Sequence, residues 1–400
     1  MPIFAYSNAS NEHMTIKEVL SKKDWKQFHA VPRRIYRNDP NWICPLESDI
    51  ESIFRPESNK TFENGNAAVF LLLDDQGRPA GRIAAFVDHT RNAKQDFPTG
   101  GVGFFECIER KDYAVALFER AAAYLAQFDV QAIDGPVNFG ERERYWGLLV
   151  KGYNKEPIFQ ENYQPPYYQS FFEDWGFRPF EQILTFQGDM MKVQIPIFRR
   201  IAQRARERYP FHSEYFDLKR LDVMADHFTR VYNRAFAHFD HFKPISQEQM
   251  LVIFKEFKAI ADPKSSTIAY YEDRPVGFTV LLPDINPYLR AARGKLNLWS
   301  LPGFLLRFRL ARKKQLKGIA FGVDPEFQRR GTIAVMIDFL YGPHLQKNYD
   351  EYFLTGIRAH NTIMVNSILN LGVEVDRYHV AYRKMLDEDL PFEPFPFTEE

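Results

Sequence analysis

The chain has 400 residues, with 52 basic and 52 acidic side chains and 45% hydrophobic residues. This length and composition exclude a disordered or fibrous chain and predict two or three domains. The balanced charge argues against a nucleic-acid-binding protein. The two cysteines, Cys44 and Cys107, are too few for a disulfide framework or a zinc site, which indicates a reducing compartment. Because no signal peptide or spanning apolar run is found, we expect a cytoplasmic protein.

The first half of the sequence alternates between strand and helix patterns. In chain order we expect a helix at 17–36, a hairpin at 68–88, a strand at 101–108, a helix at 113–127, a strand near 131–134, a helix at 166–175 and a strand at 181–187. The second half repeats this order after a basic helix at 196–209. We expect a helix at 222–236, a hairpin at 267–283, a strand at 318–323, a helix at 331–341, a strand at 351–356, a helix at 361–371 and a strand at 378–385. Such alternation predicts an α/β fold, a mixed sheet with helices on its faces.

Two landmarks occur twice at the same spacing. The hairpin turn Arg-Pro-x-Gly ends at Gly81 and again at Gly277, and a helix ends at Gly176 and again at Gly372. Both pairs lie 196 positions apart, so the sequence predicts two copies of one α/β unit, in residues 1–190 and 191–400. The 37 phenylalanines are expected mainly in the cores.

The main chemical motif is a strand, a turn and a helix in the second copy. The strand ends at Val323, and Gln328-Arg329-Arg330-Gly331 leads into a helix that opens with Thr332 and Ile333. Unpaired backbone N–H groups and the helix dipole attract a pyrophosphate at such a position. The two arginines add positive charge, and we expect the glycine to let a ligand approach the backbone.

This segment, Val-Asp-Pro-Glu-Phe-Gln-Arg-Arg-Gly-Thr, resembles motif A of the GNAT superfamily of N-acetyltransferases, and 361–373 is similar to its motif B. The sequence departs from these motifs at Ile333, where glycine or alanine is usual, and at Ile368, where the tyrosine that protonates the leaving thiolate is usual. The resemblance implies two tandem GNAT-like domains, with acetyl-CoA or another acyl-CoA as co-substrate. It implies that pantetheine lies between the splayed strands at 318–323 and 351–356. The implied coenzyme site consists of Val323, Gln328, Arg329, Arg330, Gly331, Thr332, Ile333 and Asn361.

The first copy is degenerate at the corresponding turn. Residues 109–112, Glu-Arg-Lys-Asp, contain no glycine and two acids that would repel a pyrophosphate. The resemblance therefore implies one competent site, in 191–400, with the first copy serving as structure or helping to bind an acceptor.

Acyl transfer to an amine needs a base, and the candidates are His360 and Glu326. Each also has a simpler reading, His360 as a polar residue at a helix start and Glu326 as a solvated turn acid. Asn361 suits the N-cap of the next helix. His238 and His241 are candidate acceptor-binding residues, with ordinary loop packing as the alternative. We expect no metal site, since a third strong ligand is missing nearby.

Residues 285–317 form a basic and apolar insertion without Asp or Glu. It can be a solvated basic helix face, a source of attraction for coenzyme phosphates, or a contact with a membrane surface. The sequence as a whole predicts an acyl-CoA-dependent N-acyltransferase, with acetyl transfer to an amine of a small molecule or peptide. The alternative is a non-catalytic coenzyme A-binding sensor or scaffold, associated with a membrane surface through 285–317. We expect a monomer.

Overall fold

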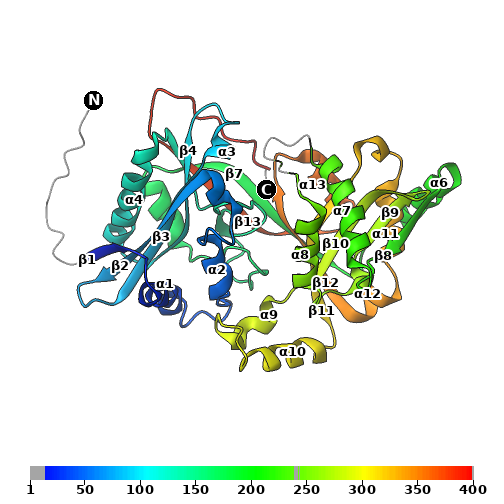
Figure 1. The fold of residues 1–400 in the computed structure, drawn as a ribbon, viewed down its shortest axis with the longest axis horizontal. Helices are drawn as coiled ribbons and strands as arrows, with labels where there is room; N and C mark the ends of the chain where they lie inside the picture. Colours follow the sequence, from blue (N-terminus) through cyan, green and yellow to red (C-terminus); the bar gives the residue numbers. More distant parts are fainter. Residues whose placement is uncertain (1–13, 238–241, 243, 399–400) are drawn as a thin grey trace. The chain divides into compact units, whose positions relative to one another are not determined.

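The computed structural model describes residues 14–237, 242 and 244–398 (Figure 1). The chain divides into two compact units. One comprises Met1–Ile183, Ala292–Asn297 and Tyr378–Glu400, and the other comprises Leu184–Ala291 and Leu298–Arg377. The sequence repeat puts its boundary near residue 190, whereas the compact units place the end of the last strand with the first half of the chain.

The first unit contains a mixed sheet in the order β1-β2-β3-β4-β5-β13, with β6 paired to β13. Its strands are β1 Met14–Glu18, β2 Gly65–Asp74, β3 Pro79–Asp88, β4 Thr99–Cys107, β5 Ala132–Gly135, β6 Leu148–Lys151 and the end of β13 Glu374–Met385. Its helices are α1 Lys22–Ile35, α2 Glu47–Ile53, α3 His89–Asn92, α4 Lys111–Leu125 and α5 Tyr167–Asp174. β4 and β5 are parallel, and the other described pairs in this unit are antiparallel.

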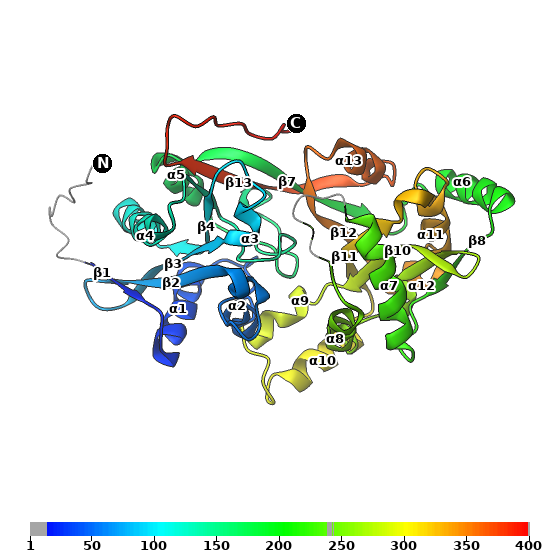
Figure 2. The same cartoon turned by 45° about the horizontal axis from the view of Figure 1, so that its top comes forward.

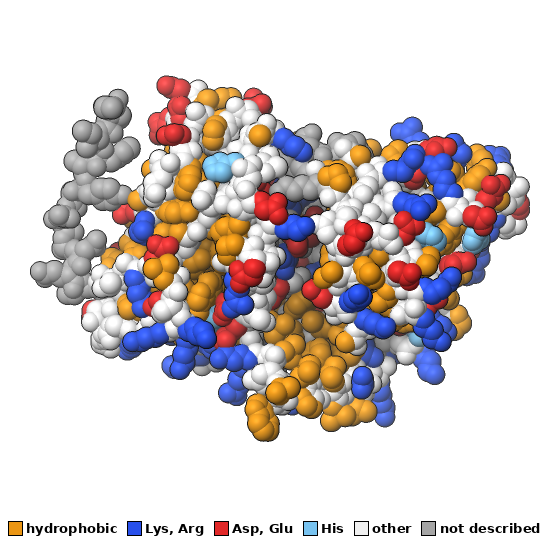
Figure 3. Space-filling model, viewed as in Figure 1, with side chains coloured by type: hydrophobic (Ala, Val, Ile, Leu, Met, Phe, Trp, Pro, Cys, Tyr) orange, Lys and Arg blue, Asp and Glu red, His pale blue; other side chains and the backbone are white. Residues whose placement is uncertain are grey.

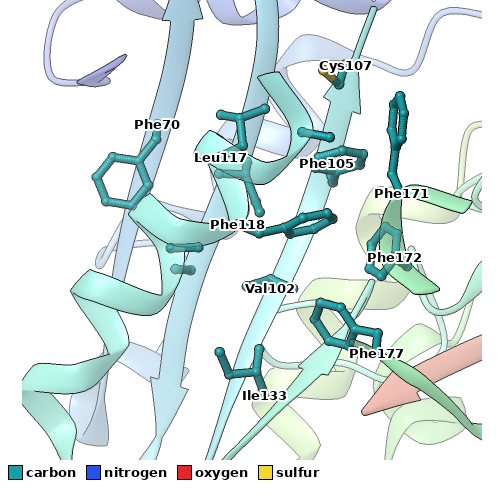
Figure 4. Close-up of a cluster of buried hydrophobic side chains, with 14 of the residues drawn as sticks. Phe70, Val102, Phe105, Cys107, Leu117, Phe118, Ile133, Phe171, Phe172 and Phe177 are labelled. Carbon is teal, nitrogen blue, oxygen red and sulfur yellow. The ribbon is translucent and has the colours of Figure 1, made fainter. Parts of the chain in front are cut away.

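Helices cover both faces of this sheet. Figure 2 shows α4 and α5 on one face and α1 and α2 on the other, and each face has its own buried cluster. The cluster beneath α4 and α5 is dominated by aromatic rings (Figure 4). The ring of Phe118 lies 4.7 Å from that of Phe105 and 4.9 Å from that of Phe172. The predicted aromatic core is therefore confirmed in this unit, where edge and stacked ring contacts add to burial.

The second unit contains a sheet in the order β7-β12-β11-β10-β9-β8. Its strands are the end of β7 Arg178–Asp189, β8 Phe211–Tyr215, β9 Thr267–Tyr271, β10 Arg274–Pro283, β11 Lys314–Val323 and β12 Tyr349–Arg358. Its helices are α6 Ile195–Arg208, α7 Leu221–Ala235, α8 Gln247–Phe257, α9 Asn286–Leu289, α10 Leu301–Leu310, α11 Thr332–Leu340, α12 Pro343–Asn348 and α13 Thr362–Leu369. β11 and β12 are parallel, and β8 to β11 are antiparallel neighbours.

The alternation of side chains along β9 and β10 assigns the helices to two faces. Ala269 and Val276 pack in the cluster that contains α6 and α11, whereas Ile268 and Phe278 pack with α7 and α8. This is the arrangement expected of strands buried on both faces.

The predicted hairpins and most predicted helices are confirmed, but the helix expected at 17–36 begins too early. Residues 14–18 form β1, which pairs with β2, and α1 starts at Lys22. Ser21 accepts a hydrogen bond from the N–H of Asp24, whose carboxylate accepts one from the N–H of Ser21. This capping box fixes the start of the helix. No helix in the described residues is long and apolar enough to cross a bilayer.

Candidate functional site

Two neighbouring parallel strands of the second unit part toward their carboxyl ends. Among the described residues the pairing of β11 with β12 ends at Gly318 and Leu354, although both strands continue for four or five residues. In its pairing with β10, β11 has a bulge at Ile319, directly after the last residue of β11 that pairs with β12. The predicted splay of these strands is confirmed. Backbone N–H and C=O groups that face the gap can pair with an extended ligand.

The turn after β11 leads into a helix that has no side-chain cap. The strand ends at Val323, α11 begins at Thr332, and between them Arg329 and Gly331 have φ angles of +60° and +89°. The N–H of Val335 donates to the carbonyl of Gly331 at 3.0 Å. The three N–H groups before Val335 open the helix, where they and the helix dipole attract negative charge.

The polar side chains of this turn brace the turn itself. The buried hydroxyl of Thr332 donates to the carbonyl of Phe327 at 2.8 Å, and the amide of Gln328 donates to the carbonyl of Val323 at 3.3 Å. The structure thus gathers the predicted residues of 323–333 in one turn. The N–H of Gln328 donates to the carbonyl of Pro325 at 3.4 Å, whereas Thr332 can offer its backbone N–H to a ligand.

Gly331 is explained by protein packing. A Cβ atom on Gly331 would lie 2.8 Å from the Cβ of Ala205 and 3.5 Å from Cγ2 of Ile201, both on α6. The expectation that this glycine leaves room for a ligand is therefore wrong on that side, because α6 fills the space. The positive φ angle is a second reason why glycine stands here.

The two arginines of the turn differ in their surroundings. Arg329 is exposed and forms no ion pair with any described residue. The guanidinium of Arg330 lies over two rings, 5.2 Å from the centre of Phe327 and 5.7 Å from that of Tyr209. Both keep their positive charge available to an anion, and the rings hold Arg330 in place.

A pocket of about 450 Å³ adjoins the turn on the side of the β9–β10 hairpin. Its lining consists of Tyr271, Glu272, Asp273, Arg274, Glu326, Phe327 and Arg330. Three carboxylates against two guanidinium groups make a poor environment for a phosphate. An anion at this turn would therefore contact its backbone and Arg329 rather than this pocket.

Two acids at the start of the turn are held by arginines. The carboxylate of Asp324, which is 1% exposed, lies 2.7 Å from Arg234 of α7 and 2.9 Å from Arg274 of β10. Glu326 pairs with the same arginines at 3.6 and 2.9 Å. The structure thus gives Glu326, one of the two predicted base candidates, a place in an ion-pair cluster. Neither arginine was predicted as part of the site, since the hairpin pattern that contains Arg274 indicated only a turn.

His360 and Asn361 follow β12. Asn361 accepts a hydrogen bond from the N–H of Met364 at 3.1 Å, so its predicted role as the N-cap of α13 is confirmed. His360 is half-buried, and its carbonyl accepts the N–H of Thr362 at 2.9 Å. Because β11 and β12 are parallel, their carboxyl ends lie at one sheet edge, a usual place for a ligand in such sheets.

Three further predictions concern the position of the usual proton donor, two histidines and a metal ion. Ile368, at the position of the usual proton donor, is buried in α13 and offers no polar atom. His238 and His241 lie outside the described residues. Among the residues that the structure describes, no group of three or more potential ligands is placed to hold a metal ion.

The corresponding gap in the first unit is filled by the chain itself. The pairing of β4 with β5 ends at Gly101 and Asp134. The N–H of Val137 then donates to the carbonyl of Val102 at 2.8 Å, so the segment after β5 occupies the edge of β4. At the start of α4, Arg110 at the N-cap forms an ion pair with Asp112 of the first turn, at 2.5 Å.

Buried polar side chains occupy the end of β4. Glu106 accepts hydrogen bonds from the hydroxyls of Tyr36 and Tyr168, each at 2.8 Å, and lies 3.5 Å from Arg82. Burial raises the pKa of Glu106, although the arginine and the two hydroxyls oppose the rise. The strand end that is open in the second unit is thus packed in the first.

No family model matches the sequence. Two proteins resemble it over nearly their whole length. Protein YghO of Escherichia coli is 24% identical over 387 residues, 93% of this chain and 95% of that protein. The bacterial ceramide synthase of Caulobacter vibrioides is 25% identical over 391 residues, 95% of this chain and 99% of that protein.

Solved structures show the same architecture at low sequence identity. A GCN5-related N-acetyltransferase from Sphaerobacter thermophilus has a TM-score of 0.52 at 11% identity, covering 97% of this chain and 99% of its own. A tandem GNAT protein from the clavulanic acid biosynthesis pathway has a TM-score of 0.51 at 12% identity, covering 93% and 98%. The predicted α/β fold with two tandem GNAT-like domains is confirmed.

Proposed function

Because the chain has the fold of the tandem GCN5-related N-acetyltransferases, we propose that it transfers an acyl group from acyl-CoA to an amine, with one competent site in the second unit. The observation that supports this most is the pairing of two features at one sheet edge. The gap between β11 and β12 offers backbone groups to an extended chain, and the uncapped start of α11 offers N–H groups to a pyrophosphate.

In this proposal the coenzyme is held by Val323, Gln328, Arg329, Arg330, Gly331, Thr332, Ile333 and Asn361. The backbone N–H groups from 329 to 333 bind the pyrophosphate, and Arg329 adds a positive charge that no ion pair with a described residue neutralises. The carbonyl of Val323 accepts a hydrogen bond from the side chain of Gln328, and this bond holds the end of β11 in place.

We propose a long acyl chain and an amino lipid as the acceptor, rather than acetyl transfer to a small molecule or peptide. A ceramide is the amide of a fatty acid with a long-chain amino alcohol, and a relative named bacterial ceramide synthase matches almost the entire chain. Three exposed isoleucines come from the elements that follow or border the gap, Ile319 in β11, Ile333 in α11 and Ile363 in α13. Exposed apolar side chains of this kind suit a hydrocarbon chain better than an acetyl group.

The reaction forms a C–N bond and breaks the C–S bond of the thioester, while the amine loses a proton and the thiolate gains one. His360 is the proposed base, since imidazole titrates near neutral pH and the residue lies at the edge where β12 ends. Ile368 cannot protonate the thiolate, so its proton must come from solvent or from His360 after that side chain has taken the proton of the amine.

Binding and turnover can be tested in sequence. Thermal unfolding with acetyl-CoA and with longer acyl-CoAs should show a larger stabilisation by the longer chains. Release of free thiol should then occur with long-chain amino alcohols and not with short amines. An absence of stabilisation by any acyl-CoA contradicts the proposal.

The buried Ile368 favours a second candidate, a non-catalytic coenzyme A-binding sensor or scaffold. This function predicts the same thermal stabilisation but no thiol release across short amines, peptides and amino lipids. Replacement of His360 by Gln separates the two, because it lowers turnover only if the chain is an enzyme.

A further inference from the structure

The insertion that carries α10 presents an unusual exposed surface in the second unit. Leu298 and Trp299 are 87% and 92% exposed, and on α10 Leu306 and Leu310 are 59% and 71% exposed. Single exposed apolar residues are normal, but four large ones that are each more than half exposed within thirteen positions are not. Figure 3 shows hydrophobic side chains gathered over α10, beside basic ones. We refer to these four residues as the α10 patch.

The inner face of α10 explains why the outer face is exposed. Phe304 and Phe308, four positions apart, are buried, and the ring of Phe308 meets that of Tyr288 of α9 at 5.3 Å. This contact anchors the helix to its own unit. With 3.6 residues per turn, Leu306 and Leu310 then project on the opposite side.

Positive charge borders the α10 patch on both sides. On a helical projection Arg307 and Arg309 flank the stripe of Leu306 and Leu310, and Arg312 follows the helix. All three arginines are exposed, and none of them forms an ion pair with a described residue. From Ile285 to Val323 the sequence contains no acid, so no carboxylate within the insertion balances this charge.

We propose that the α10 patch binds the surface of an anionic lipid membrane, with α10 lying in the plane of the interface. Leucine and tryptophan side chains enter the boundary between head groups and acyl chains, while the flanking arginines contact phosphates. Charge complementarity selects this partner, because the patch combines apolar anchors with unbalanced cations. The attachment is peripheral, since α10 has only ten residues.

The proposal depends on the surface of the second unit alone and is independent of the proposed acyl transfer. It is tested without substrate, by co-sedimentation of the full chain with phosphatidylcholine vesicles that contain or lack phosphatidylglycerol. We expect binding only to the vesicles with phosphatidylglycerol, weakened by added salt. An absence of binding to these vesicles at low salt, or equal binding to both kinds, would overturn the proposal.

Variants test the residues. Leu306→Glu should weaken vesicle binding at least about tenfold, because burial of one leucine accounts for roughly ten- to hundredfold in an equilibrium constant. Arg307→Gln should weaken it about fivefold, the contribution of one basic side chain near an anionic surface. Leu20→Glu is the matched control, since Leu20 is 79% exposed but lies in the first unit, and it should bind like the unchanged protein.

The same variants distinguish a lipid surface from a second copy of the chain. If Leu306→Glu converts a dimer into a monomer without lipid, the α10 patch is a protein interface and the proposal is wrong. Arg307→Gln keeps the test decisive should the leucine variant fail to fold, because an exposed arginine contributes little to stability. Vesicle affinity that is unchanged in Arg307→Gln, or reduced equally in Leu20→Glu, also contradicts the proposal.

Discussion

Replacement of Gly331 by alanine tests whether packing against α6 shapes the start of α11. The new methyl group would point at Ala205, with 2.8 Å between the two Cβ atoms. Carbon atoms in van der Waals contact lie about 3.5–4.0 Å apart, so α6 or the turn has to move. The substitution also forces an L-residue to keep a φ angle of +89°.

Two costs add up in this variant. A left-handed backbone costs an L-residue roughly 1–2 kcal/mol, and overpacking by one methyl group costs roughly 1–3 kcal/mol. We therefore expect the free energy of unfolding of the second unit to fall by about 2–5 kcal/mol. The affinity for an acyl-CoA should fall as well, because the N–H groups that open α11 would shift with the turn.

Urea denaturation of matched variants separates the two costs. Gly356→Ala, in the same unit, has a φ angle of +72° and no heavy atom within 4 Å of the new Cβ, so it should show only the backbone cost, roughly 1–2 kcal/mol. Ala205→Gly removes the methyl group that Gly331→Ala meets. The double variant should therefore be more stable than the sum of the single effects by about 1–3 kcal/mol.

The reasoning is refuted if Gly331→Ala destabilises the protein no more than Gly356→Ala does. It is also refuted if Ala205→Gly and Gly331→Ala are simply additive, because residues in contact must couple.

Three further predictions concern charge. Asp324→Asn should lower the free energy of unfolding by about 3 kcal/mol in urea denaturation, since it leaves guanidinium groups beside a buried neutral side chain; Glu326→Gln, at a half-exposed position, should change it by less than about 1 kcal/mol. Burial lowers the pKa of His29 to about 3 from an ordinary value near 6.5, so the folded state stays neutral where the unfolded chain binds a proton. The contribution of His29 to the free energy of unfolding should therefore be fully present above pH 6.5. It should fall by about 1.4 kcal/mol per pH unit as the pH drops from 6.5 toward 3, measured by urea denaturation at several pH values. Arg329→Gln should weaken acyl-CoA binding about three- to tenfold in titration calorimetry, whereas Arg312→Gln should not.

Local chemistry explains what the sequence predicted well. The two Arg-Pro-x-Gly turns predicted the β2–β3 and β9–β10 hairpins, because turn preferences act within four residues. Gly176 and Gly372 follow α5 and α13 with φ angles of +96° and +80°, as a left-handed helix end requires. The start of α11 at Gly331 followed from the same kind of signal.

Some missed elements also had local signals. α8 begins with a capping box, in which Ser246 accepts from the N–H of Gln249 and the glutamine side chain accepts in return. This Ser-x-x-Gln pattern, and Ser-x-x-Asp before α1, could have placed both helix starts.

Other features depend on contacts between distant residues and could not be predicted. β8 is a short edge strand whose pairing with β9 brings residues about 55 positions apart together. The packing of α6 on Gly331 and the clamp of Arg234 on Asp324 join segments from different parts of the sequence. The spacing of a motif contains no information on such contacts. The candidate turn could therefore be predicted, but its contacts with α6 and with Arg234 could not.

The last strand has a consequence for how the two halves can be separated. Residues 378–385 of β13 pair with β5 and β6, whereas residues 184–189 of β7 belong to the second unit. A fragment cut near residue 190 would leave the amino-terminal sheet without its β13 partner and carry a strand that the other fragment needs. Each half of the sequence therefore supplies a strand segment to the unit formed mainly by the other half, so neither half contains a complete sheet of its own.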